Sequence, residues 1–341
     1  MEASLPMHHH SVNGGDVYAS TQPRSPFQDK MIRYRVLEFA VAFVMVAVGG
    51  VFSVIPVHER PIPAIQVQID SKKTIYARDP SLDRKKLAEQ VPMMVLAVAG
   101  TLVPILVNLF MNFAMPKFYR IRIIPHDTRD FLLSLAQSAS ISLLLTQFMK
   151  NITGRFRPSF HDMCGWDYKK VWDGVSNLCQ DKHMEQEARK SFPSGHSSYA
   201  FATLFLLTLY LLGRVRINTH HRHETMFRGA KKMSKLFLCF APAMVAAWVA
   251  ITRSLDNWHH YSDILTGSLI GMFSAIFGYS YNYGSIFNFE SAGVPYQEVH
   301  SLRKKDDHKM RGHPLTATQS TTGGSLHEMP LTKAEFGINM Q

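Results

Sequence analysis

The 341-residue sequence predicts an all-α, polytopic membrane protein with six transmembrane helices. Hydrophobic residues make up 46% of the chain, which is ordinary for a soluble protein, but they are clustered. A transmembrane helix needs about 20 mostly apolar residues. Six such runs occur: 39–57, 91–115, 131–149, 197–213, 236–251 and 264–283. The second and sixth contain no Asp, Glu, Lys or Arg. Buried helices of a large soluble domain are the alternative, and the length of these runs argues against it.

The polar segments divide the chain into three predicted parts. Residues 1–35 are polar and lack the apolar core of a secretory leader, so the first helix is expected to be an uncleaved anchor. Residues 36–285 form the predicted six-helix membrane domain. Residues 286–341 form a polar tail, and we expect both end segments to be disordered.

The net charge of +11 is concentrated in the loops between the apolar runs. Loop 214–235 holds seven Lys and Arg against one acid, Glu224, which places it in the cytosol by the positive-inside rule. Basic loops of this kind face anionic membrane lipids. Nucleic-acid binding is not expected, because no basic segment belongs to a recognisable nucleic-acid module.

Three short motifs lie at the ends of apolar runs, and with six spans all three fall on one membrane face. The first is residues 150–158 (KNITGRFRP), which contains the cations Lys150 and Arg157. The planar fork of Arg gives phosphate two parallel hydrogen bonds, whereas Lys acts as a compact point charge. Gly154 and Pro158 indicate an abrupt turn that lets the cations converge. A single such cation is more often a lipid-headgroup anchor.

The second motif is residues 193–196 (PSGH), directly before the fourth apolar run. Ser194 and the amides near Gly195 would face an anion from a helix N-terminus. This tetrapeptide alone could also be an ordinary helix cap.

The third motif is residues 252–263 (TRSLDNWHHYSD), between the fifth and sixth runs. It adds Arg253, and it spaces His259 and Asp263 four residues apart, which on a helix would put them on one face. A carboxylate that holds one ring nitrogen leaves the other free as a nucleophile. A metal site is the alternative, and the three nearby cations would repel a metal ion.

Together the motifs resemble those of the type 2 phosphatidic acid phosphatase superfamily, in particular its lipid phosphate phosphatase branch. That family has Lys, six residues, Arg-Pro; then Pro-Ser-Gly-His; then Ser-Arg, five residues, His, three residues, Asp. Here Thr252 replaces the first Ser of the third motif, which retains a hydroxyl and adds a methyl group.

The resemblance implies a role for each matched position. His259 would attack phosphorus and form a phosphohistidine, and Asp263 would orient it. His196 would protonate the leaving lipid oxygen and later help to activate water. The resemblance implies no metal and no magnesium requirement, and it assigns phosphate binding to Lys150, Arg157, Ser194, Gly195 and Arg253.

Two further features concern packing and compartment. Cys164 and Cys179 share one polar loop and could form a disulfide or remain two free thiols. A disulfide would place the loop in an oxidising compartment. Gly267 and Gly271 form a GxxxG spacing in the sixth run, for which we expect packing within the monomer rather than dimerisation.

The predicted protein is therefore a lipid phosphate phosphatase acting on substrates such as phosphatidate or lysophosphatidate. The alternatives are a sphingoid-base, diacylglycerol or isoprenoid pyrophosphate phosphatase, and a non-catalytic lipid-binding pseudo-phosphatase. We expect a plasma-membrane or endomembrane location with the site facing the lumen or the extracellular side. The partners are membrane lipids, and homo-oligomerisation is left open.

Overall fold

The computed structural model describes residues 25–70, 73–118, 124–219, 226–287 and 293–296. Residues 1–24 and 297–341, which hold most of the two predicted end segments, lie outside the described residues; α1 forms at the end of the first. The elements in chain order are α1 (Pro26–Tyr34), α2 (Val36–Val54), β1 (Ala64–Asp70), β2 (Lys73–Arg78), the 3-10 turn η1 (Pro80–Leu82), α3 (Met93–Leu109), the π-helical turn η2 (Phe110–Ala114), α4 (Met115–Phe118), α5 (Asp127–Thr153), α6 (Phe160–Met163), α7 (Lys182–Ala188), α8 (Gly195–Ala200), the π-helical turn η3 (Phe201–Phe205), α9 (Leu206–Thr219), α10 (Met226–Leu255) and α11 (Tyr261–Asn282).

Six helical stretches are long and apolar enough to cross a membrane, which confirms the predicted fold class. They are Val36–Val54, Met93–Phe118, Asp127–Thr153, Gly195–Val215, Met233–Leu255 and Tyr261–Asn282. The third begins four residues before the predicted run, because Asp127 and Asp130 are buried in its first turn. Hydropathy alone places two such carboxylates in a loop.

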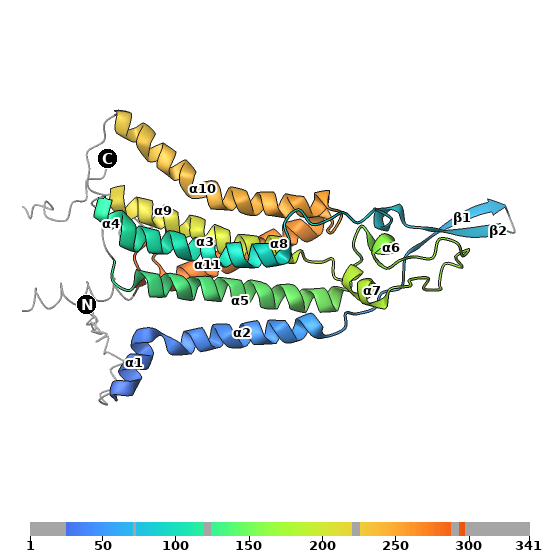
Figure 1. The fold of residues 1–341 in the computed structure, drawn as a ribbon, viewed down its shortest axis with the longest axis horizontal. Helices are drawn as coiled ribbons and strands as arrows, with labels where there is room; N and C mark the ends of the chain where they lie inside the picture. Colours follow the sequence, from blue (N-terminus) through green and yellow to red (C-terminus); the bar gives the residue numbers. More distant parts are fainter. Residues whose placement is uncertain (1–24, 71–72, 119–123, 220–225, 288–292, 297–341) are drawn as a thin grey trace, which may run out of the picture. The chain divides into compact units, whose positions relative to one another are not determined.

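Helix α5 lies among the other spans and contacts α2, α8 and α11 (Figure 1). Its buried side chains include Ser134, Ser138 and Ser142, which are small enough for close helix contact. Helix α11 packs against α8 through Gly267 and Gly271: a Cβ added at these positions would lie 2.4 Å from the carbonyl oxygen of Ser194 and 2.3 Å from that of Ser198. The GxxxG spacing therefore serves packing within one chain.

At the end where α5 begins, two buried carboxylates join several helices. Asp127 accepts hydrogen bonds from Tyr210 of α9 (2.7 Å) and Asn112 of η2 (2.7 Å). Asp130 accepts one from Arg35 (3.3 Å), whose guanidinium also donates to Asn282 at the end of α11. Buried charges are stable in a protein only when they are paired in this way.

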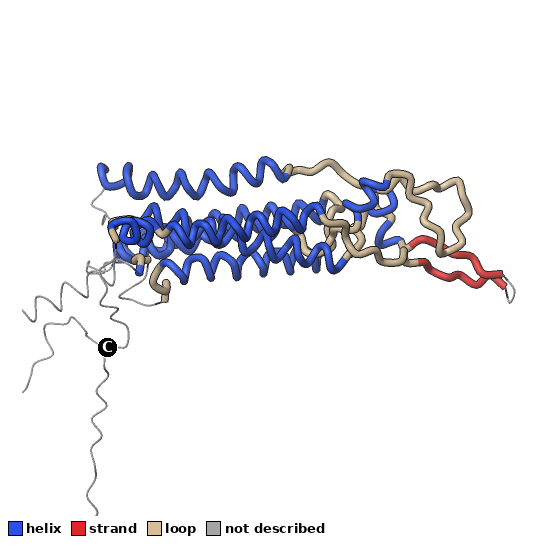
Figure 2. Tube along the Cα trace, turned by 90° about the horizontal axis from the view of Figure 1, so that it is seen from below, coloured by secondary structure: helices blue, strands red, loops and turns tan. Residues whose placement is uncertain are grey.

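At the other end of the helices, the two long connections form a cap. It includes the antiparallel hairpin of β1 and β2 and the short helices α6 and α7 (Figure 2). A core holds these parts together, and Cys164 and Cys179 form a disulfide within it; its buried members are Leu82, Phe156, Phe160, Met163, Cys164, Trp166, Trp172, Cys179 and Ala188.

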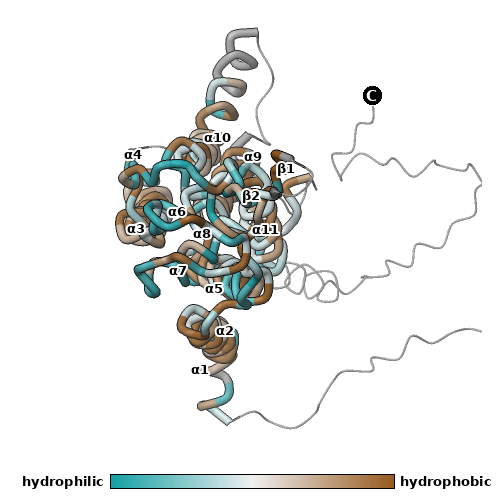
Figure 3. Tube along the Cα trace, turned by 90° about the vertical axis from the view of Figure 1, so that its right-hand side faces the viewer, coloured by the Kyte–Doolittle hydropathy of each residue, from teal (hydrophilic) through white to brown (hydrophobic). Residues whose placement is uncertain are grey.

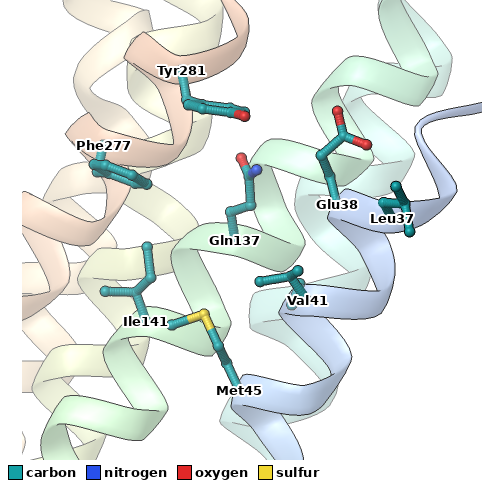
Figure 4. A pocket seen from close by; sticks show the side chains of 9 residues that line it. Leu37, Glu38, Val41, Met45, Gln137, Ile141, Phe277 and Tyr281 are labelled. Atoms are coloured by element: carbon teal, nitrogen blue, oxygen red, sulfur yellow. The ribbon is translucent and has the colours of Figure 1, made fainter. Parts of the chain in front are cut away.

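Helix α2 lies at the edge of the bundle and is hydrophobic over most of its length (Figure 3). Most of its large apolar side chains are exposed, as expected of a helix that faces lipid. A pocket of about 380 Å³ opens where α2 meets α5 and α11, and Figure 4 shows its lining. The pocket is mainly apolar, with Glu38, Gln137 and Tyr281 as its polar members.

Candidate active site

The three sequence motifs meet at the cap end of the helices (Figure 1). Lys150 lies in the last turn of α5, and Arg253 lies in the last turn of α10. Ser194 caps α8, and His196 lies in the first turn of that helix. The other predicted residues come from the connections: Arg157 follows α5, His259 precedes α11, and Asp263 is in the first turn of α11.

Gly154 makes the turn that brings the two ends of the first motif together. It terminates α5 in the left-handed conformation, with φ of 52°. A Cβ there would lie 2.0 Å from the carbonyl oxygen of His58, so another residue would meet both strain and a clash. The abrupt turn predicted from Gly154 is thus present.

Lys150 and Gly195, which come from different motifs, lie close together. A Cβ placed on Gly195 would lie 3.3 Å from Nζ of Lys150. The ammonium group therefore lies over the first turn of α8, where backbone amides are unsatisfied within the helix. An anion bound there would meet both the ammonium charge and the amide dipoles.

Arg157 is a buried guanidinium with spare hydrogen-bond donors. Its Nε and Nη1 atoms have no partner among the described residues, and the side chain is only 5% exposed. The guanidinium packs on the ring of Trp258, 4.6 Å from the centroid, and Nη2 lies 3.7 Å from Glu187. Burial lowers the pKa of Arg157 to about 10, so the group remains charged at neutral pH. Buried unpaired donors are costly, and a bound oxyanion would satisfy them.

The ring of His259 is held in one tautomer. Its Nδ1 lies 2.7 Å from the backbone carbonyl oxygen of Ser191, which can only accept. The proton is therefore on Nδ1, and the lone pair is on Nε2. Burial, reinforced by Arg157 and Lys150 and opposed by Asp263, lowers the pKa of His259 to about 4. The ring is neutral at physiological pH, as a nitrogen nucleophile must be.

Asp263 supports this arrangement differently from the predicted way. His259 and Asp263 do not share a helical face, because α11 begins only at Tyr261, but the two side chains still lie next to each other. Oδ2 of Asp263 is 3.9 Å from Nδ1 of His259 and accepts from the Ser191 hydroxyl at 2.6 Å. Oδ1 accepts from Arg155 at 2.6 Å. Asp263 thus fixes Ser191, and the carbonyl of Ser191 fixes His259.

Arg253 is fully buried and connects His196 to the third motif. Its Nη1 donates to Nε2 of His196 at 3.3 Å, and its Nη2 donates to Asp256 at 2.9 Å. The hydroxyl of Thr252 accepts from Nε of Arg253 at 3.2 Å and donates to the carbonyl of Val249 at 2.7 Å. Thr252 is 1% exposed, so its hydroxyl supports the arginine and its methyl group is accommodated in the interior.

Ser194 has a structural position at the start of α8. Its hydroxyl accepts from Ser197 Oγ at 3.0 Å and from Ser197 N at 3.4 Å. Its own amide donates to the carbonyl of Asp263 at 3.0 Å, which joins the starts of α8 and α11. The second and third motifs are therefore held in one fixed arrangement.

Comparison with known proteins places the three motifs within one family domain. The PAP2 superfamily matches residues 131–286, a stretch that contains all three motifs. Lipid phosphate phosphatase 1 of Arabidopsis thaliana is 33% identical over 243 residues, covering 71% of this chain and 67% of that protein.

The chain belongs to the PAP2 superfamily.

Two further relatives carry related names. Lipid phosphate phosphatase 2 of Arabidopsis thaliana is 36% identical over 48% of this chain and 54% of its own length. The probable diacylglycerol pyrophosphate phosphatase 1 of Schizosaccharomyces pombe is 32% identical over 41% of this chain and 49% of its own length. The chain spans about half the length of these two relatives. No solved structure matches it. Membership of the PAP2 superfamily, together with relatives named as phosphatases, supports phosphatase activity of this chain. The six apolar helices and the family identify it as a multi-pass membrane protein.

Three residues of this PAP2 site escape prediction from the sequence: Glu89, Arg155 and Ser191. Arg155 lies inside the first motif, but the spacing of that motif selects Arg157 and gives no role to Arg155. Ser191 acts through its backbone carbonyl, which any residue carries. Glu89 lies in a mixed-charge loop far from the motifs and reaches the site only through the tertiary fold.

Proposed function

We propose that this PAP2 chain is a membrane lipid phosphate phosphatase that hydrolyses phosphomonoesters of the phosphatidate and lysophosphatidate type. The observation that carries the proposal is the pairing of His259, whose Nε2 holds a lone pair, with the buried and unsatisfied donors of Arg157. One group is suited to attack phosphorus, and the other to hold its oxygens. The lipid part of the substrate follows from the position of the site at the ends of the spans and from the names of the relatives.

The first step transfers the phosphoryl group to the enzyme. The lone pair on His259 Nε2 attacks phosphorus, and the bond from phosphorus to the lipid oxygen breaks with its electron pair on that oxygen. His196 gives its Nε2 proton to this oxygen, so a neutral lipid alcohol leaves. The cations of Lys150, Arg157 and Arg253 stabilise the negative charge on the three equatorial oxygens.

The second step returns the enzyme to its starting state. His196, now neutral, takes a proton from a water molecule whose oxygen attacks phosphorus. The bond between phosphorus and His259 Nε2 breaks, and its electron pair returns to the nitrogen. Inorganic phosphate is released. The hydrogen bond from Nδ1 to Ser191 keeps the ring orientation constant through both steps.

No metal ion is needed in this scheme. A metal would supply positive charge to the phosphate oxygens, and three fixed side-chain cations already supply it here. Lys150, Arg157 and Arg253 come from three different segments and converge on one end of the bundle. Phosphate release should therefore persist in EDTA.

The site is proposed to face the lumen or the extracellular side of a plasma membrane or endomembrane. The disulfide between Cys164 and Cys179 belongs to the cap next to the site, and disulfides persist in oxidising compartments. In intact cells, a cysteine introduced at the exposed Val171 of the cap should react with a membrane-impermeant thiol reagent.

A second candidate substrate class is the lipid pyrophosphates. It is favoured by the similarity to the fission-yeast protein named as a probable diacylglycerol pyrophosphate phosphatase. The same nucleophile would attack the terminal phosphorus, with a lipid phosphate as the leaving group.

The test is phosphate release by purified protein in detergent micelles containing EDTA, with phosphatidate and diacylglycerol pyrophosphate as parallel substrates. Wild type should be active, and His259→Ala should lose at least a thousandfold in kcat, because the covalent route is removed. His183→Ala is the control: it changes a histidine on α7 that the scheme does not use. Unchanged activity in His259→Ala would refute the phosphohistidine route.

A further inference from the structure

Glu89 brings a negative charge to a site that is otherwise built for anions. Its Oε1 atom lies 3.6 Å from Nη1 of Arg253, and its Oε2 atom lies 4.0 Å from Nε2 of His196. The side chain is partly buried, at 23% exposure. A carboxylate next to phosphate-binding cations weakens phosphate binding, so its presence calls for a compensating role.

The segment that carries Glu89, residues 85–90, is firmly attached to the third motif. Gln90 donates to Asp256 twice, from its amide at 3.0 Å and from Nε2 at 2.9 Å. Trp258 Nε1 donates to the carbonyl of Leu87 at 3.0 Å. Asp256 also accepts from Arg253, so one carboxylate holds both the arginine and the segment next to it. Glu89 is thus held at the site by contacts on both sides of it.

His196 faces mostly positive groups. Arg253 of α10 donates to its Nε2, and the cations Lys150 of α5 and Arg157 of the cap also act on the ring. The neighbouring His259 before α11 is neutral. Among the residues that the structure describes, Glu89 is the acid that lies within 4.0 Å of His196. A proton on Nε2 is repelled by these cations and stabilised by the Glu89 carboxylate.

The state without substrate cannot be the acid form of His196. Arg253 has only donors, so its contact with Nε2 requires that this nitrogen carry no proton. The phosphate oxygens of a substrate would attract Arg253 away from Nε2. The nitrogen can then hold a proton, with Glu89 as its charge partner.

We propose that Glu89 is a positioning residue for the general-acid step, and this proposal rests on the proposed function. Its carboxylate stabilises the proton on His196 Nε2 until the lipid oxygen takes that proton. As the bond from phosphorus to oxygen breaks, the proton moves to the oxygen and its former bonding pair stays on Nε2. In the second step, Glu89 favours the return of a proton from water to the same nitrogen.

The test compares the pH profiles of kcat and KM for purified full-length wild type, Glu89→Gln, Glu89→Asp and Glu59→Gln, with phosphatidate in micelles containing EDTA. Glu89→Gln keeps the shape and removes the charge. It should lower kcat about tenfold and move the alkaline limb of the kcat profile down by about one pH unit, because a lost charge partner makes the proton leave earlier. KM should stay equal or fall, since a charge that repels phosphate is gone.

The other variants separate charge from structure. Glu89→Asp retains the carboxylate and should recover part of the alkaline limb. Glu59→Gln removes an exposed acid of the same connection between α2 and α3, on the other side of the β1–β2 hairpin. Glu59 accepts from Gln186 at 3.3 Å and lies outside the site, so the profile of this variant should match wild type.

Two outcomes would overturn the proposal. A lower KM with unchanged kcat and an unchanged alkaline limb would mean that Glu89 only competes with phosphate for Arg253. Equal losses at every pH, with a lower thermal midpoint, would mean that the segment is merely structural. A His259→Ala arm in the same assay separates the two hypotheses: activity in that variant would refute the phosphohistidine route, whatever the Glu89 variants show.

Discussion

Replacing Arg157 with Met should strongly lower activity while leaving the protein about as stable as wild type or more stable. Two donors of Arg157 are buried without a partner among the described residues, and each such group costs about 1–3 kcal/mol. The opposing contributions are small: an ion pair with Glu187 at 3.7 Å, whose acid is 38% exposed, and the contact with Trp258. These are worth about 1–3 kcal/mol together. Removing the two donors recovers about 2–6 kcal/mol in total, so the net change in the free energy of unfolding should lie between a loss of about 1 kcal/mol and a gain of about 5 kcal/mol.

Activity should change in the opposite direction. Each charge-assisted hydrogen bond is worth about 1.5–3 kcal/mol, so the loss of two bonds to phosphate oxygens should lower kcat/KM by about a hundredfold to ten-thousandfold. Inorganic phosphate should raise the thermal midpoint of wild type and have little effect on Arg157→Met.

Arg189→Met is the matched control, because this second buried arginine of the cap is fully paired. Arg189 donates to Glu185 at 2.8 Å and to the carbonyl of Arg60 at 2.7 Å. Its removal leaves a buried acid with less compensation and should destabilise the protein by about 3–5 kcal/mol. The assay is thermal unfolding in detergent with and without phosphate, together with phosphate release. An Arg157→Met protein that melts well below wild type and still responds to phosphate would refute the reasoning.

Three further predictions concern pH, packing and the cap. The pKa of His259 falls from its ordinary 6.5 to about 4 on folding, so the unfolded chain binds the proton first as the pH falls. The contribution of neutral His259 to the free energy of unfolding should be fully present above pH 6.5, and about 3 kcal/mol of it should be lost by pH 4. Thermal midpoints measured at both pH values should show a smaller decline for His259→Asn than for wild type. Gly271→Ala should lower the thermal midpoint, because the added methyl group meets the backbone of α8 and overpacking costs about 1–3 kcal/mol. Gly50→Ala in α2 is the control and should leave the midpoint unchanged, because nothing lies within 4 Å of the added methyl group. Equal effects of the two substitutions would contradict the packing argument. Cys164→Ser with Cys179→Ser should cost about 3 kcal/mol. On reduction, the thermal midpoint of wild type should fall to that of the double variant. A wild-type midpoint that does not change with the reductant would contradict a stabilising role of the disulfide.

The local parts of the site could be predicted from the sequence. Cations and histidines at the ends of apolar runs, with spacings that match a family, are sufficient to identify Lys150, Arg157, His196, Arg253 and His259. The number of spans places them at one end of the bundle, because each run is long enough to cross a membrane only once.

Contacts made by the backbone or by distant loops could not be predicted. The partner of His259 Nδ1 is a carbonyl, which has no signature in a sequence. The spacing of His259 and Asp263 does not decide whether both lie on the helix, because a His and an Asp four residues apart also suit a loop followed by the first turn of a helix, as found at Tyr261. Glu89 reaches the site only through the hydrogen bonds of its segment to Asp256.

The carboxylates at the far end of α5 set its position along its own axis. In a lipid bilayer the hydrophobic effect does not fix the axial position of a helix, because apolar side chains have a similar free energy next to lipid and next to a neighbouring helix. Asp127 and Asp130 supply that preference, because their hydrogen bonds to Tyr210, Asn112 and Arg35 fit a single register. A slip of one turn would carry Lys150 about 5.4 Å away from Gly195. Substitutions of Asp127 or Asp130, at the opposite end of α5, can therefore move Lys150 out of the candidate active site without changing any residue of that site.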